Sequence, residues 1–261
     1  MVAVTAPVAA DPFLDGGELD CLIEPRNVIK LGAPVDGIVA AIEADRGDAV
    51  TKGQVVARLE SGVEEAVVAL AEARAQDAFD IQSSRARFEF LQRKQDRATR
   101  LKSTNVVSAS ALDEAEMEAR VAQLAVREAE FKQHLAKLEL KRAQEILNQR
   151  VVRSPVDGVV VERLMSPGEY RHEQAPILAV AEIDPLNVEV FVPLTLFGQV
   201  KLGGGAVVVP EQPVGGSYAA RVTVVDQVLD AASGTFGVRL ELPNPGHRLP
   251  AGIRCRIRFK K

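Results

Sequence analysis

The chain has 261 residues but no tryptophan, and aromatic residues account for only 4% of it. A composition so poor in rings fits thin β modules and alanine-packed helices better than an aromatic-lined enzyme pocket. No apolar run approaches the roughly 20 residues that cross a bilayer. The net charge is −4 and no cluster of Lys and Arg is interleaved with aromatic residues, so nucleic acid is not expected as a partner.

Chemically reactive side chains are also scarce. The three histidines lie in separate segments, and none of the three methionines is near another in sequence. The two cysteines, Cys21 and Cys255, lack the spacing of metal ligands. We therefore predict no catalytic site, no metal site and no cofactor. For the cysteines we expect two buried thiols in strands, with a disulfide as the alternative.

The N-terminal segment shows few targeting signals. Residues 1–16 contain Pro7 and Pro12 and no sustained period, so we expect a flexible tail. The segment has no basic region, and the residues before Cys21 are not the small ones that precede a lipidated cysteine. We predict neither a signal peptide nor a membrane anchor in this chain.

What the chain does have is an internal repeat. Pro34-Val-Asp-Gly37 recurs as Pro155-Val-Asp-Gly158, and each copy opens a β-rich half-motif with similar glycine turns. Repeats of this kind constrain the fold more than single residues do. A long stretch rich in alanine separates the copies, so we infer one small β module that is opened at its middle by a helical insertion.

The insertion has the pattern of two long helices. No proline or glycine occurs from 63 to 102, and we predict one continuous helix there, with Asp77 and Ser84 interrupting its apolar seam. A second helix is predicted over 111–149, and alternate steps of three and four give it a seam broken only by Gln133. A sustained 3.5-residue period with a short connection predicts an antiparallel coiled-coil hairpin. The first seam contains Val63, Val67, Leu70, Ile81, Phe88 and Leu91, and the second contains Leu112, Ala115, Ala119, Ala122, Val126, Ala129, Ala136, Leu140, Ala143 and Leu147.

A further apolar row lies off the seam of the second helix. Two interpretations stay open: the row widens the interface within the hairpin, or it makes lateral contacts with neighbouring hairpins in an oligomer. The row consists of Leu124, Phe131, Leu135 and Leu138.

Outside the insertion the sequence predicts short strands. A first strand over Glu18–Ile23 is expected to stop at Pro25, and from Asp184-Pro185 onward strands alternate with glycine- and proline-rich turns, which is typical of a small barrel. The predicted fold class is α+β, an elongated chain of several modules: a split β sandwich, a long antiparallel helical hairpin inserted in it, and a small antiparallel β-barrel.

The two half-motifs resemble the halves of a lipoyl or biotinyl domain. In carrier domains of that family the turn between the halves presents a lysine that receives the cofactor. The corresponding junction here, Leu59-Glu-Ser-Gly-Val63, has no lysine and continues into the helix. The resemblance therefore implies the fold, while a carrier role in a carboxylase or dehydrogenase complex is the disfavoured alternative.

A lipoyl domain split by a helical hairpin and followed by a barrel resembles the periplasmic adaptors, or membrane fusion proteins, of tripartite efflux and type I secretion systems. The tip of the hairpin matches the family pattern Arg-x3-Leu-x6-Ser at Arg97, Leu101 and Ser108. The resemblance implies that these residues dock on a trimeric outer-membrane channel. It also implies an inner-membrane transporter as a partner, with resistance–nodulation–division pumps favoured over ABC pumps, a functional hexamer, and a periplasmic location without enzymatic activity.

The resemblance also assigns the modules. The tail is 1–16, the barrel is formed by 17–31 and 184–261, the lipoyl-like domain by 32–61 and 150–183, and the hairpin by 62–149 with its tip at 103–110. In the family the N-terminal strand joins the barrel, which would bring Cys21 near Cys255 and allow a disulfide. The remaining alternatives are an adaptor of an ABC-type or type I protein secretion system and a coiled-coil scaffold without a transport role.

Overall fold

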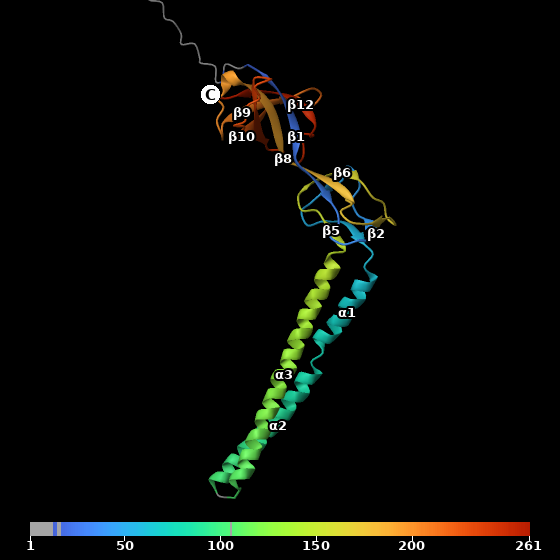
Figure 1. Cartoon of the computed structure of the whole chain (residues 1–261), viewed down its shortest axis with the longest axis vertical. Coiled ribbons are helices and arrows are strands. Elements are labelled where there is room, and N and C mark those ends of the chain that lie inside the picture. The colour runs from blue at the N-terminus through green and yellow to red at the C-terminus, as the bar shows by residue number, and fades with distance from the viewer. Residues whose placement is uncertain (1–12, 15–16, 105) are drawn as a thin grey trace, which may run out of the picture. The chain divides into compact units, whose positions relative to one another are not determined.

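The computed structural model describes residues 13–14, 17–104 and 106–261. The chain divides into two compact units (Figure 1). One is a β unit formed by the two ends of the chain, up to Leu59 and from Val152 onward, and the other is a helical unit over Glu60–Val151. Together they give the mixed fold predicted from the sequence, in which β-sandwich and barrel elements are combined with a helical hairpin.

Six antiparallel strands of the β unit close into a barrel, because β1 pairs with both β12 and β8 at the two ends of the strand order β1-β12-β9-β10-β11-β8. Inward-facing residues of alternating strand positions fill its core, with Ile23, Leu186 and Val188 fully buried. The strands are β1 (Leu19–Leu31), β8 (Leu178–Pro193), β9 (Gly205–Pro210), β10 (Tyr218–Val225), β11 (Thr235–Leu242) and β12 (Ile253–Phe259).

The prediction of a strand stop at Pro25 is wrong. Strand β1 passes through Pro25, which lies opposite Leu186, and the register with β8 shifts between Pro25 and Asn27. Proline is tolerated in a strand at such a bulge. Strand β8 is equally long and runs through Asp184-Pro185, so both strands contribute to the barrel and to the neighbouring sandwich.

The sandwich contains both copies of the repeat. A four-stranded sheet has the order β5-β4-β2-β7, and β6 and β3 pair beside β8 in the other sheet. Position 158 in the second copy must be glycine, because a Cβ there would overlap the carbonyl oxygen of Ala181. The additional strands are β2 (Gly37–Ile42), β3 (Ala49–Val50), β4 (Val55–Leu59), β5 (Val151–Arg153), β6 (Gly158–Arg163) and β7 (Tyr170–Arg171).

Most of the predicted tail, residues 1–12 and 15–16, lies outside the described residues. Phe13 and Leu14 do not behave as a free tail. Phe13 forms a β-bridge with Lys260 and packs under the guanidinium of Arg258, and the backbone N–H of Leu14 donates to the carbonyl of Phe259.

The cysteines are disulfide-bonded, and the expectation of two free buried thiols is wrong. Cys21 in β1 lies directly opposite Cys255 in β12 in the antiparallel register, and the two Cα atoms are 4.9 Å apart. Directly opposed residues point to the same face of a sheet, so both thiols reach one another inside the barrel.

The helical unit is a hairpin whose first arm is broken. Helix α1 (Gly62–Gln76) ends at Asp77, and α2 (Phe79–Ser103) begins after Ala78, where one continuous helix was predicted. The second arm is the unbroken α3 (Ala109–Asn148). The predicted seam of α3 is confirmed, since none of its positions is exposed and five of its alanines are buried: Ala115, Ala119, Ala122, Ala129 and Ala143.

The seam predicted for the start of the first arm is wrong. Val63, Val67 and Leu70 are 75%, 49% and 54% exposed, whereas Ala71 and Ala75 are buried against α3. The observed seam of α1 is therefore offset by one residue from the predicted one. Beyond the break, Ile81 is buried and Phe88 and Leu91 are partly buried, as the predicted pattern requires.

Candidate functional site: the tip of the helical hairpin

The tip is a tight connection between α2 and α3, and hydroxyl groups satisfy the carbonyls at the end of α2. Ser103 Oγ donates to the carbonyl of Arg100 (2.6 Å) and Thr104 Oγ1 to that of Leu101 (3.0 Å). The backbone N–H of Val106 donates to the same Leu101 carbonyl (3.0 Å). These bonds replace the helical partners that the last carbonyls lack.

The three residues of the tip pattern have different surroundings. Arg97 is exposed and makes no ion pair or hydrogen bond with any residue that the structure describes, and Leu101 is 45% exposed. Four residues apart on α2, they are neighbours on one helix face. Ser108 is the N-cap of α3, where its Oγ accepts from the N–H of Ala111 (3.2 Å) and lies 3.0 Å from Ser110 Oγ.

The face of α2 that carries Arg97 and Leu101 points away from α3. The seam side of α2 at this level is formed by Ala98 and Lys102, which are partly buried. A guanidinium without a described partner beside an exposed leucine and the exposed Val106 (70%) therefore forms a surface of mixed charge and apolar character at the tip.

Ion pairs between the arms hold the hairpin in register below the tip. Lys94 Nζ pairs with Glu118 and Arg85 with Glu130, each at 2.6 Å. The hydrogen bond that Lys94 donates to Glu118 raises the pKa of Lys94 above its ordinary value. Exposed pairs of this kind contribute little stability individually, and their main effect here is to fix which residues of α2 and α3 lie level.

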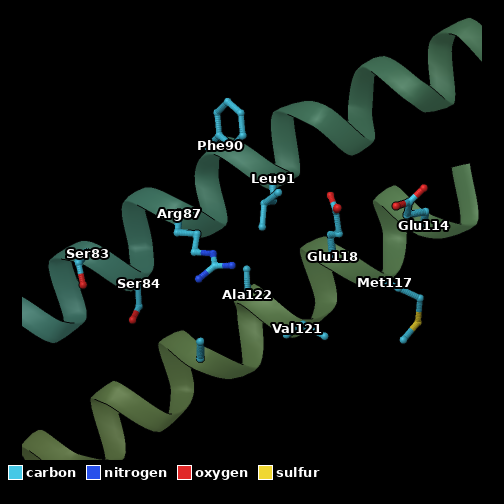
Figure 2. A pocket seen from close by; sticks show the side chains of 11 residues that line it. Ser83, Ser84, Arg87, Phe90, Leu91, Glu114, Met117, Glu118, Val121 and Ala122 are labelled. Atoms are coloured by element: carbon cyan, nitrogen blue, oxygen red, sulfur yellow. The ribbon is translucent and has the colours of Figure 1, made fainter. Parts of the chain in front are cut away.

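A groove of about 880 Å³ runs between α2 and α3 near this end. Figure 2 shows Arg87 and Leu91 pointing from α2 toward Ala122, while Phe90 and Met117 point outward from the two helices in opposite directions. The groove is lined by both polar and apolar side chains of the two helices.

The predicted lateral row on α3 lies on the solvent side of the helix. Its members are 55%, 60%, 42% and 50% exposed, so the row does not widen the interface within the hairpin: Leu124, Phe131, Leu135 and Leu138. Met117 and Val121, which sequence analysis left out, extend the row toward the tip and are 59% and 60% exposed. Their spacing of three and four residues would have revealed them.

Other kinds of site were also sought. Among the described residues, no group of three or more His, Cys, Asp or Glu side chains is placed to hold a metal ion. None of the helices that the structure describes is long and apolar enough to cross a membrane.

Comparison with known families identifies the architecture. The family described as "CzcB-like, barrel-sandwich hybrid domain" matches residues 27–182, and "CusB-like, beta-barrel domain" matches residues 186–261. The chain belongs to the membrane fusion proteins, the periplasmic adaptor family of efflux systems. The two matched regions meet where β1 and β8 pass from the sandwich into the barrel.

Solved structures of this family share the fold at low sequence identity. MacA from Actinobacillus actinomycetemcomitans is 20% identical with a TM-score of 0.66, covering 97% of this chain and 82% of that one. A MacA–MexA chimera with the hairpin of Pseudomonas aeruginosa MexA is 21% identical with a TM-score of 0.54, covering 93% and 80%. Spr0693 from Streptococcus pneumoniae R6 is 14% identical with a TM-score of 0.56, covering 94% and 98%.

Two curated relatives are longer than this chain. An uncharacterized protein of Haemophilus influenzae is 22% identical over 91% of this chain and 56% of its own length. A UPF0194 membrane protein of Acidithiobacillus ferridurans is 28% identical over 45% of this chain and 38% of its own length. The chain thus spans about half or less of the curated relatives it matches.

Proposed function

We propose that this protein is a non-enzymatic periplasmic adaptor of a tripartite efflux pump, which links an inner-membrane transporter to a trimeric outer-membrane channel for the export of small molecules. Family membership supports the adaptor role. The observation that carries the link to a channel is the tip, where Arg97 and Leu101 share an outward face and Arg97 has no partner among the described residues.

A resistance–nodulation–division transporter is favoured over an ABC transporter by the tip pattern, which is typical of adaptors for the former and of some for the latter. A periplasmic location is supported by the Cys21–Cys255 disulfide, because such bonds persist in oxidising compartments. An ABC-type or type I secretion adaptor remains the second candidate, and both candidates use the same tip.

Self-association is supported by two apolar rows on opposite sides of the hairpin. On α3 the row runs from Met117 to Leu138, opposite the seam. On α2 a row of exposed residues lies opposite its own seam, with Phe79 (72%) and Phe90 (56%) at its ends and the small Ser83 and Ala86 between them.

The shorter α2 row lies level with part of the α3 row. Because Arg85 pairs with Glu130 and Lys94 with Glu118, Phe90 on α2 lies level with Leu124 of the α3 row. A row on one side and a complementary row on the other suit head-to-tail packing of identical hairpins, which closes into a ring when the rotation permits. We propose the hexamer implied by the family as that ring.

The tip is tested by charge reversal. Arg97→Glu places a carboxylate at the proposed joint, and it is expected to abolish efflux in cells that carry the transporter and the channel. Since Arg97 has no partner among the described residues, the melting temperature of the purified protein should stay unchanged. Arg93→Glu, one turn farther from the tip on the same helix, is the control; it also removes the exposed Arg93–Glu89 pair (4.0 Å), which contributes little stability. Full transport by Arg97→Glu would refute tip docking.

A further inference from the structure

The sequence of the first arm contains two alternative apolar stripes, each with steps of three and four residues, and either could face α3. We call each of these stripes a frame. In the observed frame Val68, Ala71 and Ala75 face α3, followed by Ala78. The next step of four would reach Gln82, yet the residue that is buried beyond the break is Ile81, one position earlier. A heptad seam that loses one residue cannot continue along a regular helix, and the break at Asp77–Ala78 absorbs the mismatch.

The second frame needs no break. Alternate steps of four and three from Val63 reach Val67, Leu70, 74 and 77 and arrive at Ile81 in phase. In an unbroken first arm, three of the large apolar side chains that are now exposed would therefore face α3 in place of Val68, Ala71 and Ala75. Ile81, Phe88 and Leu91 belong to both frames, so the packing of α2 and the tip would not change.

The break is held by side chains rather than by the backbone. The N–H of Phe79 donates to Asp77 Oδ1 (2.9 Å), and the amide of Gln133 donates to the carbonyl of Asp77 (3.3 Å). Gln133 is the one polar residue of the α3 seam. With no proline or glycine between 63 and 102, nothing in the local sequence forbids a helix through Asp77 and Ala78.

An ion pair at the base of the hairpin holds α1 in the observed rotation. Arg150 binds Glu64 through its terminal nitrogen at 2.6 Å, and the two side chains are only 22% and 16% exposed. This pair and the Gln133 contact favour the broken arm, while the exposure of Val63, Val67 and Leu70 opposes it. The two frames thus draw support from different residues, and the second frame would also turn Arg74 and Asp77 toward α3.

We propose that the first arm is a two-state element. In one state it is broken at Asp77, and in the other it is a continuous helix in which α1 is turned by one residue, about 100° about its axis. The switch decides whether the Val63–Val67–Leu70 stripe faces solvent or α3. Any partner that covers this stripe selects the broken state. The proposal does not depend on the proposed function.

Thiol labelling of engineered cysteines reads out the frame, and the bonded Cys21 and Cys255 do not interfere. Val67→Cys and Val68→Cys are made in separate chains, and the thiol at 67 should react faster than the thiol at 68. Arg74→Leu with Asp77→Leu completes the second frame with apolar side chains and removes the carboxylate that caps Phe79. We expect the order to reverse, with labelling at 67 slowed by about tenfold or more.

The matched control is Glu72→Leu with Gln76→Leu, which adds the same two leucines outside both frames and should leave the order of labelling unchanged. If the Arg74/Asp77 variant retains full helical circular dichroism and still labels faster at 67, the second frame does not exist. Should that variant fail to fold, Gln133→Leu removes only the amide that binds the Asp77 carbonyl. It should shift labelling in the same direction, and wild-type labelling rates in it would equally overturn the proposal.

Discussion

A variant that lacks the apolar row of α3 tests whether this row serves the folding of one hairpin or the assembly of several hairpins. The variant Phe131→Ser, Leu135→Ser, Leu138→Ser replaces side chains that are 60%, 42% and 50% exposed in the single chain. Full burial of such a side chain is worth about 1.5–3 kcal/mol, so covering the exposed half of each contributes about 1 kcal/mol. The three together contribute about 3 kcal/mol per interface, or more than a hundredfold in association.

The isolated variant should melt within a few degrees of the wild type, because exposed positions away from the seam tolerate substitution. In cells that also carry the transporter and channel, cross-linked multimers and efflux should both be lost. The control Arg127→Ser, His134→Ser, Lys141→Ser changes three exposed residues, spaced seven apart, on the adjacent row of α3. Multimers of unchanged abundance in the Phe131 variant would refute the lateral packing of hairpins.

Three further predictions concern the separate units. Gly158→Ala should destabilise the β unit by about 1–3 kcal/mol in urea unfolding, since its Cβ would overlap the Ala181 carbonyl oxygen. Cys21→Ala with Cys255→Ala removes a bond across 234 residues and should cost about 2–5 kcal/mol, while thiol counting of the denatured, unreduced wild type should find none. The pKa of Glu64 is lowered by a backbone hydrogen bond at the start of α1 and by its partner Arg150. The stability that the Glu64 carboxylate contributes is therefore fully present above about pH 4.3 and is lost as the pH falls through the lowered pKa. Unfolding measured at several pH values should show this dependence in the wild type and lose it in Glu64→Gln.

The second helix shows why part of the hairpin could be predicted from the sequence. Along α3 the seam positions are small or apolar at every step but Gln133, and no competing frame has alanine at the same spacing. The exception has a structural reason, since Gln133 faces the break in the first arm and donates to the Asp77 carbonyl. The sequence shows that Gln133 is polar, but it does not show that its hydrogen-bond partner is the Asp77 carbonyl.

The first arm shows the opposite case. Val63, Val67 and Leu70 form a stronger apolar pattern than the observed seam of α1, which contains Glu64, Val68 and two buried alanines. Hydrophobicity alone selects the wrong frame, because the compensating partner of Glu64 is Arg150, at the other end of the insertion. Neither proline nor glycine marks the break, and its local sign is Asp77, which interrupts the apolar seam and accepts a hydrogen bond from the N–H of Phe79.

The disulfide illustrates a limit that alternation imposes on β structure. That the first and last strands share the barrel follows from the family resemblance. Whether the two cysteines meet depends on the strand register, because a slip of one residue moves each side chain to the opposite face of the sheet. Only the pairing of Cys21 with Cys255 in the β1–β12 ladder decides it. The bulge at Pro25, in the same strand, is equally a property of the paired partner rather than of the local sequence.

The distribution of side-chain sizes in the hairpin indicates where its larger apolar residues are used. An ordinary amphipathic helix buries its large side chains and exposes small or polar ones. Here the seam of α3 is mainly alanine, which allows close approach of the arms but buries little area, while phenylalanine, leucine, valine and methionine lie on the outer row. Burial within one hairpin cannot account for that arrangement. A second protein surface along the row would. Because the exposed α2 row from Phe79 to Phe90 lies level with part of the α3 row, we propose another copy of this hairpin as that surface.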